Sequence, residues 1–254
     1  MLNNDFDPKG GSLSVIAVTQ PLHGSVQIQG NGQEVLYIPD GIGKSQSHFS
    51  GVVTFLYQAQ NEKLSAWSNV TVTVLNHPPQ AVSLVYTISK NSANNIASVL
   101  TDKSTTGAMA YDIDMDQLFV ISCSVPSNGS ARILNNKTIS YTPNTGFEGI
   151  DAVSYIITDL NDTSSATINW AVQNDPPQAN PDFFISTKNS IAFDIEVLAN
   201  DVDPNHDPLT ISEIRNSGLG IAYLSSNTWI DYYPPYGFSG FDSFEYSCTD
   251  GSLL

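Results

Sequence analysis

The chain has 254 residues and a formal net charge of −16, with 25 aspartate and glutamate residues against 9 lysine and arginine residues. This charge repels a phosphate backbone, so the sequence argues against nucleic-acid binding. No apolar run approaches the roughly 18 residues of a spanning helix, and the first residues do not resemble a signal peptide. We therefore expect no membrane insertion within the chain, and any targeting segment or anchor outside it.

One set of residues recurs three times along the chain. In each copy a leucine is followed eleven residues later by a glycine (24 − 13 = 129 − 118 = 220 − 209 = 11), then by Tyr-x-Pro and Phe-x-Gly. The glycines are 105 and 91 residues apart (129 − 24 and 220 − 129), a spacing that suits a compact all-β domain of about 100 residues. The sequence therefore predicts three successive domains. The recurring residues are Leu13, Leu118, Leu209, Gly24, Gly129, Gly220, Tyr37, Tyr141, Tyr232, Phe49, Phe147 and Phe238.

Strand patterns dominate each copy, and helical patterns are almost absent. In the first copy, residues 12–18, 25–29, 53–59 and 70–74 are short segments rich in β-branched or aromatic residues. About seven such strands per copy, separated by turns, predict an antiparallel two-sheet β-sandwich. One strand of each copy has an apolar residue at every second position, which predicts a buried face. These apolar residues are Phe55, Tyr57 and Ala59, then Val153, Tyr155 and Ile157, then Phe244, Tyr246 and Cys248.

Two similar linkers separate the copies. Residues 76–81 (NHPPQA) and 174–179 (NDPPQA) begin 98 positions apart (174 − 76), and paired prolines make a stiff spacer. We therefore predict an end-to-end rod of three domains with limits 1–76, 77–174 and 175–254. The first copy is expected to be incomplete at its N-terminal end and the third at its C-terminal end.

Two further features belong to single copies. An insertion near residues 101–107 is expected to form an exposed loop of the second copy. Cys123 and Cys248 occupy non-equivalent positions in different copies, which argues against a disulfide framework. Cys248 continues an alternating apolar series and is expected to be a buried thiol.

The third copy carries the clearest family likeness. It contains Asn200-Asp201-x-Asp203-Pro204, Asp207-Pro208-Leu209-Thr210-Ile211, a Tyr-x-Pro, and Gly237-Phe238-x-Gly240-x-Asp242-Ser243-Phe244-x-Tyr246-x-x-x-Asp250-Gly251, with an Asn-Asp-x-Pro linker. This pattern resembles the cadherin-like tandem repeats of large bacterial surface proteins and adhesins. The resemblance implies a tandem array of Ig/cadherin-like antiparallel β-sandwich domains with Greek-key connections, and calcium ions at the junctions between successive domains.

The chemistry of the acidic loops agrees with calcium binding. Ca²⁺ takes about six to eight oxygen ligands in flexible geometry, and an Asp-x-Asp in an extended loop projects two carboxylates towards one side. Such carboxylates repel one another unless a cation or solvent compensates them. An isolated loop aspartate also shapes turns, so the hypothesis depends on several acids matching one pattern.

The resemblance implies two unequal calcium sites. At the first junction, Val53 and His77 stand where Asp151 and Asp175 stand at the second, so the first site is depleted. The role of Asp207 stays open, because the first copy has glycine in its place. The ligand set implied for the second junction is Asp151, Asn174, Asp175, Asp201, Asp203 and Asp250. The weaker set implied for the first junction is Asp112, Asp114 and Asp159, with Asp112-x-Asp114 as the counterpart of Asp201-x-Asp203 and with Asn76 in the linker.

The resulting hypothesis is a segment of an extracellular or cell-surface, calcium-binding, rod-forming protein that acts in cell adhesion or as a surface spacer. Its partners are the neighbouring repeats of the same chain. The alternative is a carbohydrate- or protein-binding accessory module of a larger secreted protein, with a cell-surface glycan or protein as partner. Trp229 is the contact candidate for this alternative, because no aromatic residue aligns with it in the other copies. We do not expect an enzyme, because an active site is seldom copied into every repeat.

Overall fold

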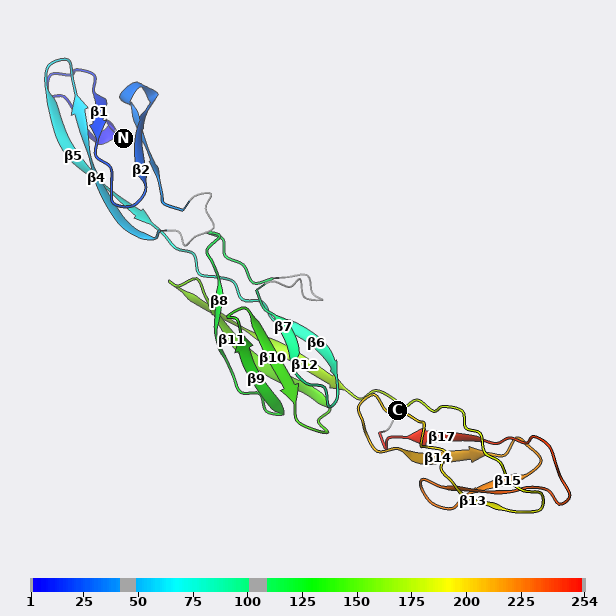
Figure 1. The fold of residues 1–254 in the computed structure, drawn as a ribbon. Coiled ribbons are helices and arrows are strands. Elements are labelled where there is room, and N and C mark those ends of the chain that lie inside the picture. Colours follow the sequence, from blue (N-terminus) through cyan, green and yellow to red (C-terminus); the bar gives the residue numbers. More distant parts are fainter. Residues whose placement is uncertain (1, 42–48, 101–108, 253–254) are drawn as a thin grey trace.

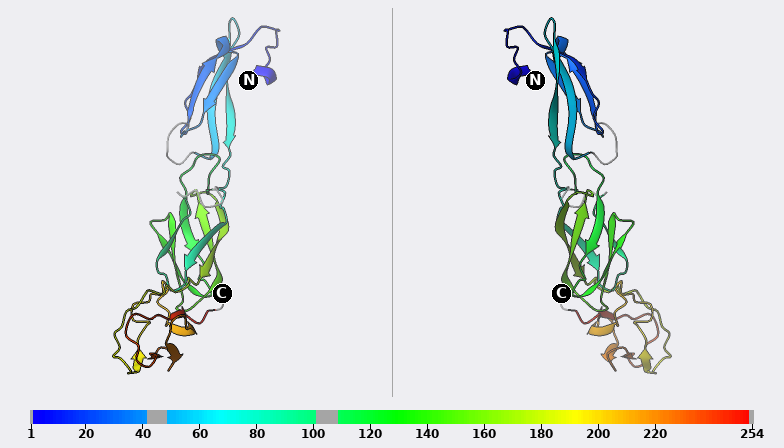
Figure 2. Two further views of the ribbon diagram at one scale, coloured as in Figure 1. Left: turned by 90° about the vertical axis from the view of Figure 1, so that its right-hand side faces the viewer. Right: turned by 90° about the vertical axis from the view of Figure 1, so that its left-hand side faces the viewer.

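The computed structural model describes residues 2–41, 49–100 and 109–252 and folds them into β-sandwiches that follow one another end to end (Figure 1, Figure 2). The all-β class is confirmed, and helix in these residues is limited to the 3-10 turns η1 (Leu2–Asn4) and η2 (Gly30–Gly32). No helix in the described part of the chain is long and apolar enough to cross a membrane. The insertion predicted near 101–107 lies outside the described residues.

The described part of the second repeat contains seven strands in two sheets. One sheet has the order β6-β12-β11-β8 and the other β7-β10-β9. Neighbouring strands are antiparallel except β6 and β12, which run parallel with Leu84 opposite Ile168. The strands are β6 (Leu84–Ser89), β7 (Asn95–Ser98), β8 (Phe119–Cys123), β9 (Gly129–Leu134), β10 (Thr138–Pro143), β11 (Gly149–Thr158) and β12 (Thr163–Gln173).

The outer repeats contain five described strands each and pair them in the same way. The sheets β1-β4-β5 and β14-β17 correspond to β8-β11-β12, whereas β2-β3 and β13-β16-β15 correspond to β7-β10-β9. Neither outer repeat has a described counterpart of the parallel β6–β12 pair. Their strands are β1 (Ser14–Val18), β2 (Ser25–Gln29), β3 (Glu34–Ile38), β4 (Gly51–Gln60), β5 (Ser65–Val74), β13 (Ala192–Ile195), β14 (Thr210–Arg215), β15 (Ile221–Leu224), β16 (Ile230–Tyr233) and β17 (Glu245–Thr249).

The apolar alternation predicted from the sequence builds the core. Val153, Tyr155 and Ile157 on β11 are buried, and the residues between them face outwards. Trp170 on β12 is fully buried and stacks on Tyr141, with 5.0 Å between the ring centroids. Complete burial of one such side chain contributes about 1.5–3 kcal/mol, so the second repeat has a substantial core of its own.

The corresponding face of the third repeat is more open. Phe244, Tyr246 and Cys248 alternate as predicted, but each is only partly buried. Cys248 is therefore not the buried thiol that the alternation predicted. No described strand of the third repeat takes the place of β12, so β17 pairs with β14 alone and its core face is covered less completely.

The recurring glycine and tyrosine form a single packing contact. A Cβ atom on Gly129 would lie 2.6 Å from Cε2 of Tyr141 and 2.6 Å from the carbonyl oxygen of Thr142, closer than van der Waals contact. Equivalent clashes occur at Gly24 and Gly220. The recurring glycine is therefore required where the tyrosine ring lies across the neighbouring strand.

Each linker ends by pairing with the repeat that follows it. Gln80 forms an isolated antiparallel bridge with Tyr111, and Gln178 forms one with Val202. These bridges fix the linkers directly beside the acidic loops at residues 112–116 and 203–207. The junctions therefore contain the loops in which the sequence placed cation ligands.

Candidate metal centre

The acidic loop of the third repeat folds around Asp203. Its Oδ1 accepts hydrogen bonds from the backbone N–H groups of Asn205 (2.8 Å) and Asp207 (3.0 Å). Asparagine and aspartate commonly stabilise turns in this way. The loop closure leaves the other carboxylate oxygen, Oδ2, available for other interactions.

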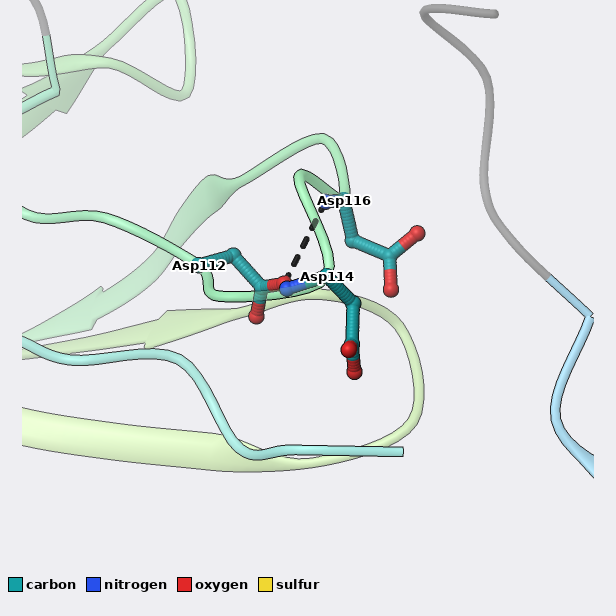
Figure 3. A group of neighbouring side chains, drawn as sticks. All are labelled: Asp112, Asp114 and Asp116. Carbon is teal, nitrogen blue, oxygen red and sulfur yellow. Dashed lines mark hydrogen bonds between the residues drawn. The ribbon is translucent and has the colours of Figure 1, made fainter. Parts of the chain in front are cut away.

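The acidic loop of the second repeat has the same form (Figure 3). Oδ1 of Asp112 accepts hydrogen bonds from the backbone N–H groups of Asp114 (2.8 Å) and Asp116 (3.3 Å). Counted back from the recurring leucine, Asp112 corresponds to Asp203 (118 − 112 = 209 − 203 = 6), and the hydrogen bonds agree with this correspondence. The interpretation that matched Asp112 to Asp201 is wrong by two residues.

In the first repeat, the protein itself satisfies both oxygens of the equivalent aspartate. Asp7 accepts hydrogen bonds from the backbone of Lys9 (2.9 Å) and Gly11 (3.2 Å) and from Nδ2 of Asn61 (2.8 Å). These donors, led by the Lys9 amide, lower the pKa of Asp7. Asp159 in the second repeat and Asp250 in the third occupy the position of Asn61. Their carboxylates have no proton to donate at neutral pH.

Three carboxylates meet at the second junction. Asp203, Asp207 and Asp250 each place one oxygen within 4.8 Å of the others. The Asp203 side chain is buried, with 7% of its surface exposed, and among the described residues its Oδ2 has no hydrogen-bond partner. A buried carboxylate oxygen without a partner is costly, so this atom favours a cation-binding role for the group.

Two of the predicted residues, Asn174 and Asp175, belong to the linker and contact the third repeat at the second junction. Nδ2 of Asn174 donates to Oδ2 of Asp250 at 2.5 Å, and this bond is the main reason that the pKa of Asp250 is lowered. The backbone N–H of Asp175 donates to Oδ1 of Asn205 at 2.6 Å. Nδ2 of Asn205 in turn donates to Oδ2 of Asp175 at 3.2 Å, so linker and loop are joined in both directions.

A lysine of the second repeat also enters the second junction. Nζ of Lys90 lies 2.9 Å from Oδ2 of Asp207 and 3.3 Å from Oδ1 of Asn174. The hydrogen bond to Asp207 is the main cause of the raised pKa of Lys90. The recurring residues that define the three copies do not include Lys90, so this cation that the protein itself provides was not predicted.

Two residues predicted for the second site are used elsewhere. Asp151 accepts hydrogen bonds from the hydroxyl of Tyr141 (2.9 Å) and the backbone of Asn128 (2.9 Å), within the second repeat. Asp201 accepts hydrogen bonds from the hydroxyl of Tyr246 (3.0 Å) and the backbone of Asn180 (2.7 Å), within the third. Neither belongs to the three-carboxylate group at the second junction, so we leave both out of the proposed site.

The residues predicted for the depleted site of the first junction do not all lie together in the structure. Oxygens of Asp112, Asp114 and Asp116 lie within 4.8 Å of one another, and Asp116 was not among the predicted residues. His77 contacts Asp114 through its backbone N–H (2.7 Å) and through Nδ1 (3.0 Å). The third predicted residue, Asp159, is not a member of this group.

Asp159 instead binds the linker and its own loop. Its Oδ2 accepts a hydrogen bond from Nδ2 of Asn76 (2.9 Å), and its Oδ1 accepts one from the backbone of Asp162 (2.6 Å). Burial acts to raise the pKa of Asp159, but these hydrogen bonds outweigh burial and lower it. The first junction is therefore joined by direct protein contacts as well.

Trp229, the candidate contact residue, is only partly exposed. It lines one hollow together with Asp201, Asp203, Asp207 and His206. Its carbonyl oxygen accepts a hydrogen bond from the backbone of Ser225 at 3.0 Å. A contact between Trp229 and a glycan or protein therefore stays a prediction.

The residues that the structure describes form six sheets in three successive sets, with acidic loops at the linkers. This arrangement defines a tandem immunoglobulin-like repeat protein. A family model described as "Bacterial Ig domain" matches residues 1–74, 76–170 and 174–253. The chain belongs to this family, which confirms that it consists of tandem Ig-like repeats. A search of curated proteins found no match.

Similar solved structures include repeat proteins and an enzyme. An endo-fucoidan hydrolase of glycoside hydrolase family 107 matches 97% of this chain with 17% identity and a TM-score of 0.28, but this chain spans only 38% of the hydrolase. Human protocadherin-24 EC1-2 matches 67% of this chain and 86% of its own length, with 13% identity and a TM-score of 0.32. Drosophila N-cadherin EC1-4 matches 97% and 65%, with 11% identity and a TM-score of 0.28. At these TM-scores the likenesses add nothing to the assignment by family.

Proposed function

We propose that this chain is a rod-forming spacer segment of a larger extracellular or cell-surface protein, and that its second junction binds Ca²⁺. Support for a spacer comes from the arrangement of the repeats, which follow one another end to end and are joined through short proline-containing linkers (Figure 1). A rod of this kind presents other parts of a surface protein at a distance, as adhesion requires.

The observation that carries the calcium proposal is the buried Oδ2 of Asp203, which has no hydrogen-bond partner among the described residues. The neighbouring Asp207 and Asp250 add negative charge within 4.8 Å. A cation bound by these three residues would satisfy the oxygen and relieve the repulsion between the carboxylates.

The available ligand atoms favour a hard cation. Carboxylates of Asp203, Asp207 and Asp250 and the amide oxygen of Asn174 are all oxygen donors, which suit Ca²⁺ better than softer metals. They come from loops and a linker rather than from a rigid helix, and Ca²⁺ accepts such irregular geometry more readily than Mg²⁺. A bound ion would hold the second and third repeats together, and would stabilise both by linkage.

Thermal unfolding with and without calcium tests this proposal. Calcium at about 100 times its Kd adds roughly 2.7 kcal/mol to the folded state, so the melting temperature of the third repeat should rise by on the order of 10 °C over its value in EDTA. Asp203→Asn should abolish this rise. The matched control is Asp7→Asn, because the first repeat already satisfies the equivalent carboxylate. Equal melting temperatures of the native chain in calcium and EDTA would refute the calcium site.

A further inference from the structure

The second junction contains a protein cation that belongs to the repeat before it. Lys90 follows β6, and its backbone N–H donates to the carbonyl of Gln173 at 2.6 Å, which anchors it beside the end of β12. From there Nζ reaches Oδ2 of Asp207 in the third repeat at 2.9 Å. The ion pair is well shielded, with 13% of the lysine side chain and 15% of the aspartate side chain exposed.

Amide hydrogen bonds hold the same two loops together. Nδ2 of Asn91 donates to the carbonyl of Asn205 at 2.8 Å, and Nδ2 of Asn205 donates to the carbonyl of Lys90 at 3.0 Å. The lysine is therefore held between two fixed loops rather than moving freely over the surface. Fixed geometry and partial burial are the conditions under which an ion pair gains most from its Coulomb attraction.

We infer that Lys90 is a tethered cation that closes the second junction when calcium is scarce and competes with calcium for the same carboxylates. The closing of the junction by the ion pair between Lys90 and Asp207, called the clasp below, does not depend on calcium binding. The competition rests on the proposed calcium site. A calcium ion bound to Asp207 would place two positive charges close to the Lys90 ammonium. Because the two cations repel each other, only one of them occupies the carboxylates at a time. Lys90 thereby lowers the affinity of the junction for calcium.

The third repeat provides a matched control lysine. Lys188-Asn189 repeats Lys90-Asn91, because both asparagines have positive φ (59° for Asn91, 62° for Asn189). Both also accept a glycine amide, from Gly146 at 2.8 Å and from Gly237 at 2.6 Å. Lys188 is exposed. Lys188→Gln removes the same charge as Lys90→Gln and changes no contact at the second junction.

Two measurements on the full chain test the inference. In EDTA, small-angle scattering of Lys90→Gln should show a broader distribution of distances than the native chain or Lys188→Gln. Asp207→Asn should broaden it similarly, and the double variant should be no broader than either single variant. In calorimetric titration with calcium chloride, Lys90→Gln should bind about ten-fold more tightly or better, and Lys188→Gln should match the native chain.

The outcomes separate this inference from the proposed function. Identical scattering of Lys90→Gln and Lys188→Gln in EDTA would overturn the clasp. Equal calcium affinities of Lys90→Gln and the native chain would overturn the competition. If Lys90→Gln broadens the distribution but no chain binds calcium, the clasp is supported, and the calcium site is refuted together with the competition that rests on it. Circular dichroism of each variant shows whether the sandwiches remain folded.

Discussion

One aspartate has different hydrogen-bond partners in the first and third repeats because its neighbours differ. Asp7 has the amide of Asn61 beside its Oδ2, whereas Asp203 has the carboxylate of Asp250 nearby. An amide donates a proton to the oxygen, and a carboxylate repels it. The exchange of a single residue therefore accounts for the difference in hydrogen bonding between Asp7 and Asp203, and under the proposed function it decides whether the loop binds a cation.

A reciprocal exchange of these residues tests that explanation. Asp250→Asn should remove the calcium response of the third repeat, since the new amide replaces one cation ligand and donates to Asp203. Asn61→Asp should destabilise the first repeat in EDTA and introduce a calcium response there. Thermal unfolding of both variants in EDTA and in calcium measures the two effects. If Asn61→Asp gains no calcium dependence and Asp250→Asn loses none, the neighbour at this position does not govern the site.

A second contact at the residue scale joins the recurring tyrosine to an aspartate of the same repeat. In the third repeat the hydroxyl of Tyr232 donates to Oδ2 of Asp242 at 2.6 Å. This bond, with the amides of Gly220 and Leu219, lowers the pKa of Asp242 from 3.8 to about 2. Burial and the same carboxylate raise the pKa of Tyr232 to about 12. The sequence argument assigned the equivalent Asp151 to calcium, but both carboxylates serve the fold.

The lowered pKa of Asp242 predicts an acid-sensitive contribution to stability. Since the folded state favours the carboxylate, this stabilisation is present above the unfolded pKa of 3.8 and is lost as the pH falls towards about 2. Asp242→Asn should flatten the dependence of the free energy of unfolding on pH between these values. Urea unfolding of the native chain and the variant across this range measures the difference. Equal slopes would show that the pKa is not lowered.

At the scale of the strands, the contact between glycine and tyrosine explains why the repeat is visible in the sequence. Gly129 lies against Tyr141, which is fully buried, and against the backbone of Thr142. Because the backbone has little freedom to withdraw, even one added methyl group is too large. Packing therefore explains why a glycine recurs beside this tyrosine, although the number of residues between them varies (37 − 24 = 13, 141 − 129 = 232 − 220 = 12).

Gly129→Ala should destabilise the second repeat by about 1–3 kcal/mol, the usual cost of overpacking. Ser130→Ala, at an exposed position of the same strand, is the control and should change stability by less than about 0.5 kcal/mol. Chemical denaturation of both variants measures the cost. A Gly129→Ala variant as stable as the control would mean that the tyrosine ring moves aside freely.

Strand alternation allowed much of the fold to be predicted, because one buried face leaves a period of two in the sequence. The series Val153, Tyr155 and Ile157 is buried as expected. The register of the acidic loop was not predictable from Asp-x-Asp alone, since the second repeat contains two overlapping pairs that satisfy it, Asp112 with Asp114 and Asp114 with Asp116. The count back from the recurring leucine and the hydrogen bonds to the amides two and four residues later together identify Asp203 as the counterpart of Asp112.

At the scale of the whole molecule, the two junctions are held in different ways. The first joins His77 to Asp114 and Asn76 to Asp159. The second brings the Lys90 loop of one repeat onto the acidic loop of the next. Lys90 and Asp207 are 117 positions apart (207 − 90), and no local pattern connects them. Their contact depends on the angle between two domains, which is why the sequence did not reveal it.

The central claim is that Asp203, Asp207 and Asp250 bind a calcium ion, and terbium luminescence tests it most directly. Tb³⁺ also prefers oxygen ligands, and Trp229 lines the same hollow as Asp203 and Asp207, so it can sensitise emission from a bound ion. We predict saturable terbium emission on tryptophan excitation, reversed by calcium and greatly reduced in Asp203→Asn and in Trp229→Phe. Emission that is undiminished in Asp203→Asn, or that calcium does not reverse, would contradict a calcium site at the second junction.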